Sequence, residues 1–252
     1  MTRLQALIFD VDGTLADNER DGHRVAFNEA FAAYGLDWDW TPDLYGRLLE
    51  VTGGKERIKF YLESYLTGEL SPNDSDAFIA ALHKEKTRRY TDIIAQRRLP
   101  LRIGVERLLH EARDAGLRLA IATTTSLINV TTLLENTLSP DAVKWFEVIA
   151  AGDMVKFKKP APDIYEYALE ALNLKPDQCL AFEDSINGLR SATQAGLQTL
   201  ITYNDYTAEQ HFDQALFVSD HLGDPQTPCT VLKSPVAHVK LVDVPLLKQL
   251  LS

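Results

Sequence analysis

Cysteine is scarce in this chain of 252 residues, which contains only Cys179 and Cys229. The two are far apart and lack a metal-type spacing, so we expect buried free thiols, as in a reducing cytosol. The sequence also lacks an apolar run of the roughly 20 residues that a bilayer span needs. Residues 1–3 lead directly into an apolar stretch, which leaves no room for a signal or transit peptide. We therefore expect a cytoplasmic protein with no membrane partner.

An excess of basic residues is also missing, because 26 Lys and Arg stand against 36 Asp and Glu, for a net charge of −10. This balance argues against nucleic acid as the principal partner. It is compatible with a small phosphorylated molecule, since charges beyond a Debye length of about 8 Å are largely screened from a local basic site. The length allows one large core, or a core with a smaller appended domain. We expect a monomer.

The most informative stretch is LIFDVDGTL at residues 7–15, an apolar strand that ends in two aspartates. Carboxylates at the end of a buried strand emerge where open α/β sheets place their ligands. Asp10 and Asp12 could then divide nucleophilic attack and proton transfer, whereas a solvated Asp-Gly turn is the simpler alternative. An EF-hand calcium loop also begins Asp-x-Asp, but it needs glycine and glutamate where this chain has Leu15 and Asp21.

From residue 100 onward, short apolar runs alternate with helical patterns, which favours a parallel sheet with helices on both faces. Gly116 and Gly196 each lie between a predicted helix and a predicted strand, where a left-handed cap is common. We therefore predict an α/β fold with a doubly wound, Rossmann-like core made of residues 1–16 and 97–252. The tail after residue 220 is expected to be a packed extension without chemistry.

Residues 17–96 have another character, with three apolar stripes at helical spacing punctuated by glycine and proline. The economical interpretation is an all-helical cap domain inserted after the first strand. It would lie over the carboxyl ends of the strands as a lid. A separate helical domain with no catalytic part is the alternative.

Polar residues also follow the next predicted strands. The run Thr123–Ser126 offers hydroxyls and amides for phosphate oxygens, although such a run is also an ordinary helix cap. Further along, a basic loop contains Lys156, Lys158 and Lys159. One of these lysines could point inward, but a solvated basic turn explains the loop equally well.

A second pair of acids, Glu183 and Asp184, ends a later apolar strand. A parallel sheet would bring them to the same edge as Asp10 and Asp12. Four carboxylates together repel one another, so they either shift their pKa values or take up a cation. Carboxylate oxygens with room for water and phosphate suit Mg²⁺.

These four motifs, in this order, resemble the haloacid-dehalogenase superfamily of phosphotransferases over residues 3–220. The helical insert resembles the small cap of β-phosphoglucomutase. More narrowly, residues 18–24, 52–58 and 122–126 resemble CbbY-type xylulose-1,5-bisphosphate phosphatases. Those enzymes remove an inhibitor of Rubisco in carbon-fixing cells.

The resemblance implies a role for each motif. Asp10 would be the nucleophile that becomes an aspartyl-phosphate, and Asp12 would protonate the leaving alkoxide and then deprotonate water. Thr123 would bind the transferring phosphoryl group, and Lys159 would offset its charge. The implied Mg²⁺ ligands are Asp10, the carbonyl of Asp12, Asp184 and, as an outer or water-mediated ligand, Glu183.

A second candidate site lies in the cap, at Thr52-Gly53-Gly54-Lys55-Glu56-Arg57. Exposed amides at a predicted helix N-terminus, with two basic side chains, make an anion site, unless this is an ordinary helix start. It would hold the phosphate that is not transferred, so that a bisphosphate spans cap and core. Glu19 and His23, on the hinge side of the cap, would then reach the sugar hydroxyls. The substrate-binding candidates are Glu19, His23, Thr52, Gly53, Gly54, Lys55, Arg57 and Thr124.

Magnesium-dependent hydrolysis of a sugar bisphosphate is therefore the leading hypothesis, with xylulose 1,5-bisphosphate giving xylulose 5-phosphate and phosphate. β-Phosphoglucomutase shares the motifs but returns the phosphoryl group to the sugar. A phospho-accepting signalling domain gathers similar residues, but such domains are shorter and lack a helical insert.

Overall fold

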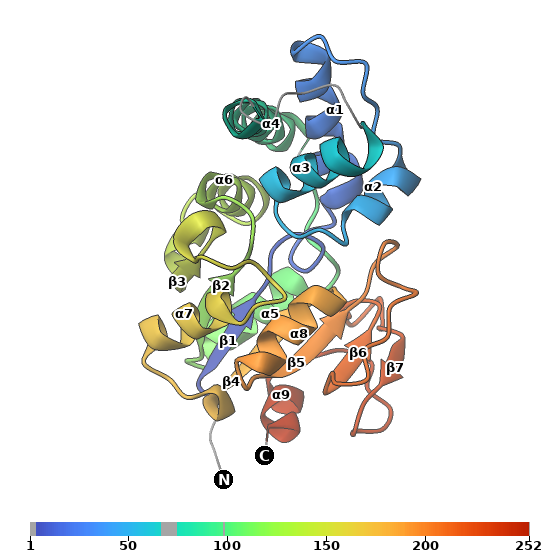
Figure 1. Ribbon diagram of the computed structural model, residues 1–252. Helices are drawn as coiled ribbons and strands as arrows, with labels where there is room; N and C mark the ends of the chain where they lie inside the picture. Colours follow the sequence, from blue (N-terminus) through green and yellow to red (C-terminus); the bar gives the residue numbers. More distant parts are fainter. Residues whose placement is uncertain (1–3, 67–74, 98, 252) are drawn as a thin grey trace.

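The computed structural model describes residues 4–66, 75–97 and 99–251, and seven strands of this part of the chain form one sheet (Figure 1). Their order is β3-β2-β1-β4-β5-β6-β7, and every neighbouring pair is parallel except β6 with β7. The strands are β1 (Ala6–Phe9), β2 (Arg118–Ala122), β3 (Phe146–Ala150), β4 (Cys179–Glu183), β5 (Gln198–Thr202), β6 (Phe217–Ser219) and β7 (Val231–Lys233).

The central strand β1 shows why the sheet is covered on both faces. Leu7 and Phe9 belong to the larger hydrophobic cluster, whereas Ala6 and Ile8 belong to a second one. Alternate side chains of a strand point to opposite faces, so an unbroken apolar strand needs helices on each side. The larger cluster includes α5 (Val105–Asp114) and α6 (Leu127–Thr137), and the second includes α7 (Asp163–Leu172) and α8 (Ile186–Gln194). The predicted doubly wound α/β core is confirmed.

Four helices gather at the end of the molecule towards which β1 points (Figure 1). They are α1 (Arg24–Ala33), α2 (Pro42–Leu48), α3 (Gly54–Tyr65) and α4 (Ser75–Arg97), preceded by a short π-helix, η1 (Glu19–His23). Their shared cluster is aromatic, with Phe27 and Phe31 packed against Trp40. The α4 helix also reaches the core, because Tyr90 belongs to the larger sheet cluster.

The sequence reasoning did not anticipate α2, whose residues include proline and glycine. Pro42 suits the first turn, where its missing N–H is not needed, and Thr41 Oγ1 accepts from Leu44 N at 3.3 Å as an N-cap. The buried side chains of Tyr45 and Leu48 hold the helix against the other cap helices.

The tail contributes to the sheet side of the molecule through β7 and α9 (Val244–Leu250). Val242 and Leu247 are fully buried in the larger cluster, so the tail packs as expected. Cys179 and Cys229 are free and buried, as predicted. Single turns complete the chain, at η2 (Ala142–Trp145), η3 (Gly152–Met154) and η4 (Pro176–Gln178).

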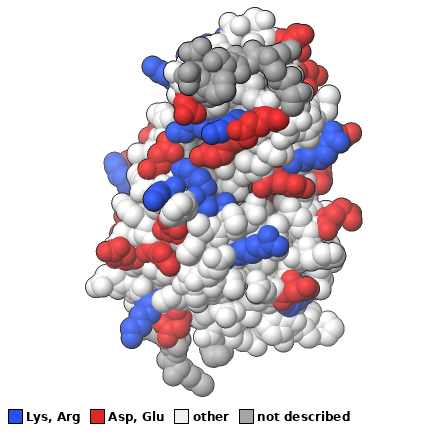
Figure 2. All heavy atoms as spheres, viewed as in Figure 1, with Lys and Arg blue, Asp and Glu red and all other residues white. Residues whose placement is uncertain are grey.

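Within the described residues, we find no helix that combines the length and the apolar character required to cross a bilayer. The face seen in Figure 2 carries acidic and basic side chains close together, in a band across the middle of the view. This band lies at the height where the cap helices of Figure 1 meet the sheet-bearing part.

Candidate active site

The first site side chains leave the sheet where β1 ends. The backbone amide of Asp10 donates to Phe182 O of β4 at 2.9 Å, which places this carboxylate at the carboxyl edge of two adjacent strands. Gly13 then turns the chain with a φ of +81°. A Cβ at Gly13 would lie 2.3 Å from Asp184 Oδ2, so both the backbone angle and the close approach require glycine.

Three buried carboxylates meet at this edge. Oxygens of Asp10, Glu183 and Asp184 lie within 4.8 Å of one another. Burial raises the pKa of Asp10 to about 8 and lifts the pKa of Asp184 well above its usual range, because the charged forms lose contact with water. Asn204 Nδ2 donates to Asp184 Oδ2 at 2.7 Å. Clustered carboxylate oxygens with this excess of negative charge fit a hard divalent cation such as Mg²⁺.

One buried lysine partly neutralises the cluster. Lys159 Nζ lies 2.7 Å from Asp10 Oδ1, 2.5 Å from Glu183 Oε1 and 2.8 Å from Ala122 O. The other two lysines of the loop point elsewhere, Lys158 to Asp153 and Lys156 over the ring of Phe157. Of the three lysines of this loop, Lys159 is therefore the one that points into the carboxylate cluster.

Glu183 is positioned by two groups that the sequence reasoning did not single out. Tyr165 of α7 donates its hydroxyl to Glu183 Oε1 at 2.6 Å. Gly188 of α8 leaves the carboxylate room, since a Cβ there would lie 1.8 Å from Glu183 Oε2. Tyr165 shares the apolar stripe of its helix with Ile164 and Ala168, so its spacing indicated core packing and hid the polar contact.

The threonine after β2 lies beside the same carboxylates. Thr123 is buried, and its amide donates to Ala150 O at 3.0 Å, which continues the strand pairing into the loop. Thr123, Asp10 and Lys159 line one cavity of about 560 Å³ together with the cap residues Glu19 and Thr52.

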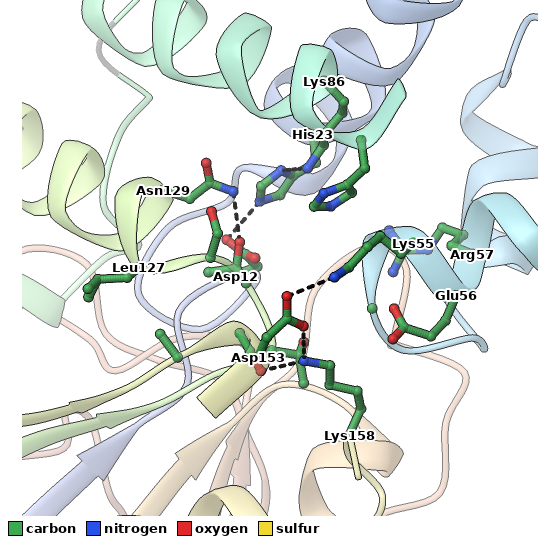
Figure 3. A pocket seen from close by; sticks show the side chains of 18 of the residues that line it. Asp12, His23, Lys55, Glu56, Arg57, Lys86, Leu127, Asn129, Asp153 and Lys158 are labelled. Atoms are coloured by element: carbon green, nitrogen blue, oxygen red, sulfur yellow. Dashed lines mark hydrogen bonds and ion pairs between the residues drawn. The ribbon is translucent and has the colours of Figure 1, made fainter. Parts of the chain in front are cut away.

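The Asp12 carboxylate lies beside His23 of the cap (Figure 3). His23 Nε2 lies 2.9 Å from Asp12 Oδ1, and Asn18 Nδ2 donates to the same oxygen at 2.7 Å. Burial alone would raise the pKa of Asp12, but His23 and Asn18 outweigh it and lower the pKa to about 2. Behind the imidazole, Lys86 Nζ of α4 lies 2.7 Å from His23 Nδ1, and Tyr90 stacks on the ring with centroids 3.8 Å apart.

Cap residues Glu19 and Arg57 are connected through Tyr45. The Tyr45 hydroxyl donates to Glu19 Oε2, and Arg57 Nη1 donates to the Tyr45 oxygen at 3.0 Å. Arg57 also donates to Leu48 O at 3.2 Å and is 8% exposed. Glu19 and Arg57 line both the 560 Å³ cavity and a second one of about 360 Å³.

The second cavity adjoins the first and contains the predicted anion segment. Its walls include Gly53, Gly54 and Lys55 from the cap and Thr124 from the core. Gly53, the N-cap of α3, has a φ of +97°, a backbone conformation that favours glycine. The two cavities share Asp12, Glu19, Arg57 and Thr124.

A sequence model of the haloacid dehalogenase-like hydrolases matches residues 4–196. The chain belongs to this family. "Protein CbbY" of Rhodobacter capsulatus is 54% identical over 212 residues, which are 84% of this hydrolase and 91% of that protein. "Phosphorylated carbohydrates phosphatase" of Thermotoga maritima is 32% identical over 198 residues, 78% of this chain and 84% of that one.

A crystal structure of a CbbY mutant from Rhodobacter sphaeroides in complex with xylulose-(1,5)bisphosphate is also similar. Its TM-score is 0.81 at 46% identity, and the match covers 86% of this hydrolase and 94% of that chain. The superfamily resemblance read from the motifs is confirmed.

The hydrolase thus brings the predicted residues to two adjoining cavities, although not all to one point. Asp10, Lys159 and Asp184 meet at the strand ends, whereas the Asp12 carboxylate pairs with His23. Thr52 Oγ1 accepts from Asn187 Nδ2 of the core at 3.2 Å, a contact between cap and core.

Proposed function

We propose that this hydrolase removes one phosphate from a sugar bisphosphate, and that its substrate is xylulose 1,5-bisphosphate. The observation that carries the proposal is the pairing of the two cavities. One is lined by Asp10 beside the buried Lys159, and the other by basic cap residues at a helix N-terminus. The complex of the related CbbY with xylulose-(1,5)bisphosphate supports this choice of sugar.

Asp10 attacks the phosphorus of the reacting phosphate in our proposal. A bond forms between its carboxylate oxygen and phosphorus, and the bond from phosphorus to the sugar oxygen breaks. Asp12 gives a proton to the leaving alkoxide and then takes one from the water that attacks the aspartyl-phosphate. This attack releases inorganic phosphate and restores Asp10. The two acids thereby divide nucleophilic and proton-transfer work.

Lys159 and Thr123 stabilise the transferring group. Phosphoryl transfer depends on positioning and on positive charge at the equatorial oxygens more than on acid strength. Asp10, Asp184 and the Asp12 carbonyl would hold Mg²⁺, with Glu183 as an outer ligand. When bound, the ion neutralises negative charge on the carboxylates and the phosphate.

The remote phosphate lies, in this proposal, against Lys55, Arg57 and the amides at Gly53 and Gly54. Its binding energy keeps the cap domain, residues 17–96, closed over the core and positions the reacting phosphate. Glu19, oriented by Tyr45, contacts a sugar hydroxyl together with His23. The cellular consequence would be removal of an inhibitor of Rubisco.

The test is phosphate release from a panel of phosphorylated sugars, with kcat/KM compared for xylulose and ribulose 1,5-bisphosphate. We expect a clear preference for the xylulose ester, because a site built around a hydroxyl leaves its own polar groups unpaired with the wrong isomer. Asp10→Asn should release no phosphate, whereas Asp17→Asn, the same change at an exposed position of the loop, should behave as wild type.

β-Glucose 1-phosphate with its bisphosphate activator is the informative competitor. Efficient formation of glucose 6-phosphate with little free phosphate would show that the protein is a mutase and would overturn the proposal. Wild-type turnover by Asp10→Asn would overturn the mechanism.

A further inference from the structure

An ion pair between residues that line the second cavity joins cap and core (Figure 3). Lys55 Nζ of α3 lies 2.7 Å from Asp153 Oδ2, and Asp153 belongs to the loop after β3. The other oxygen, Asp153 Oδ1, lies 2.8 Å from Lys158 Nζ. One carboxylate therefore bridges two ammonium groups, each through a different oxygen.

This bridge is much more exposed to solvent than the buried ion pair of Lys159. The Asp153 side chain is 68% exposed and that of Lys55 41%, whereas Asp10 and Lys159 are 10% and 4% exposed. Exposed ion pairs contribute little to stability and are screened by salt. Hydrogen bonds from Lys158 and Lys55 lower the pKa of Asp153 to about 2, so it is an anion at neutral pH.

We propose that Asp153 is an internal anion that occupies Lys55 and Lys158 until the remote phosphate of the substrate displaces it. This inference rests on the proposed function, since it assigns the remote phosphate to the same cavity. A phosphate dianion has more charge and three terminal oxygens, so it outcompetes a single carboxylate for two ammonium groups. A hydroxyl or a singly charged group does not.

Asp153 is thereby a specificity-determining residue. It makes the two lysines available only to a dianionic remote group, and it weakens the retention of a product that keeps its remote phosphate. Because the carboxylate is mostly exposed, it can swing into water when displaced, without breaking a buried contact.

The test compares Asp153→Asn with wild type, using xylulose 1,5-bisphosphate and p-nitrophenyl phosphate, which has no remote phosphate. We expect the ratio of the bisphosphate KM to the monophosphate KM to fall about two- to fivefold, the range for loss of an exposed ion-pair competitor. Asp141→Asn is the matched control, since it removes a carboxylate from another exposed pair, with Lys144, and should leave the ratio unchanged.

A double-mutant cycle with Lys55→Met shows whether the fall in the KM ratio depends on Lys55. In the Lys55→Met background, Asp153→Asn should change the logarithm of the KM ratio by at most half of the change that it causes when Lys55 is present. An unchanged or increased KM ratio in Asp153→Asn, or the same decrease with and without Lys55, would overturn the inference.

Equilibrium binding of inorganic phosphate, measured by calorimetry, tests the inference about Asp153 independently of the proposed substrate. Asp153→Asn should bind phosphate about two- to fivefold more tightly, and this gain should depend on Lys55. Failure of the proposed function appears as no phosphate release from the bisphosphate by wild type. Failure of the inference appears as unaltered phosphate binding in Asp153→Asn.

Discussion

Replacing Lys159 by methionine should destabilise the metal-free protein far more than the same change at its neighbour Lys158. Lys159 is 4% exposed and bridges Asp10 and Glu183, whereas Lys158 pairs with Asp153, whose side chain is 68% exposed. Methionine keeps the length and apolar contacts of the stem, so the comparison isolates the charge.

The expected magnitudes follow from the partners. Removing one member of a buried ion pair costs about 3–5 kcal/mol, because the remaining charge stays out of water without compensation. For Lys159→Met that charge belongs to Asp10 and Glu183, beside a third carboxylate, Asp184. In the Lys158 pair the Asp153 side chain is 68% exposed and can regain water, so loss of this pair costs only about 0–1 kcal/mol.

Urea unfolding at pH 9, above the pKa of about 8 at which Asp10 ionises, measures both variants in the presence of a chelator. The Lys159→Met deficit should shrink at pH 5, where carboxyls of raised pKa take up protons, and should also shrink when Mg²⁺ is added. Similar losses in the two variants, or a deficit below about 1 kcal/mol for Lys159→Met, would refute the assignment of a charge-compensating role to the buried lysine.

Three further outcomes test the site. In the metal-free wild type, the pKa of Asp10 is about 8, above that of an unfolded chain, so the folded state holds an extra proton between about pH 4 and 8. Stability should therefore fall as pH rises through this window, by up to about 1.4 kcal/mol per pH unit for each proton held, and Mg²⁺ should flatten the fall in a pH series of urea melts. Asp184→Ala should need much more Mg²⁺ for half-maximal phosphate release, and a chelator should abolish wild-type turnover; full activity in excess chelator would contradict the metal assignment. Gly188→Ala should reduce kcat, because its Cβ would lie 1.8 Å from Glu183 Oε2, and its unfolding free energy should fall by about 1–3 kcal/mol.

The core site could be predicted because its residues follow strands. Asp10 and Asp184 each follow an apolar strand, and a parallel sheet brings the carboxyl ends of its strands to one edge. The fold class follows from the same alternation of runs and helical stripes. Lys159 was one of three candidates, since a loop does not reveal which side chain turns inward.

Contacts across the cap could not be predicted in this way. Lys86 reaches His23 because α4 crosses α1 and η1, a packing that helical periodicity leaves open. Its position in an apolar stripe indicated burial but not a polar partner. The α2 helix was missed because Pro42 and Gly46 are also typical of loops, and its aromatic partners come from distant segments.

Asp10 and Asp12 show how two carboxyls one residue apart acquire opposite properties from their surroundings. Core burial raises the pKa of Asp10 to about 8, whereas His23 and Asn18 hold that of Asp12 at about 2 although it too is buried. A carboxylate with so low a pKa is ready as a base but cannot give up a proton it does not hold. In the proposed reaction, a phosphate dianion beside Asp12 would raise its pKa and so favour uptake of the proton that Asp12 gives to the leaving group. His23, which lowers the pKa of Asp12, belongs to η1 of the cap, so the two carboxyls owe their opposite pKa shifts to contacts with different parts of the molecule.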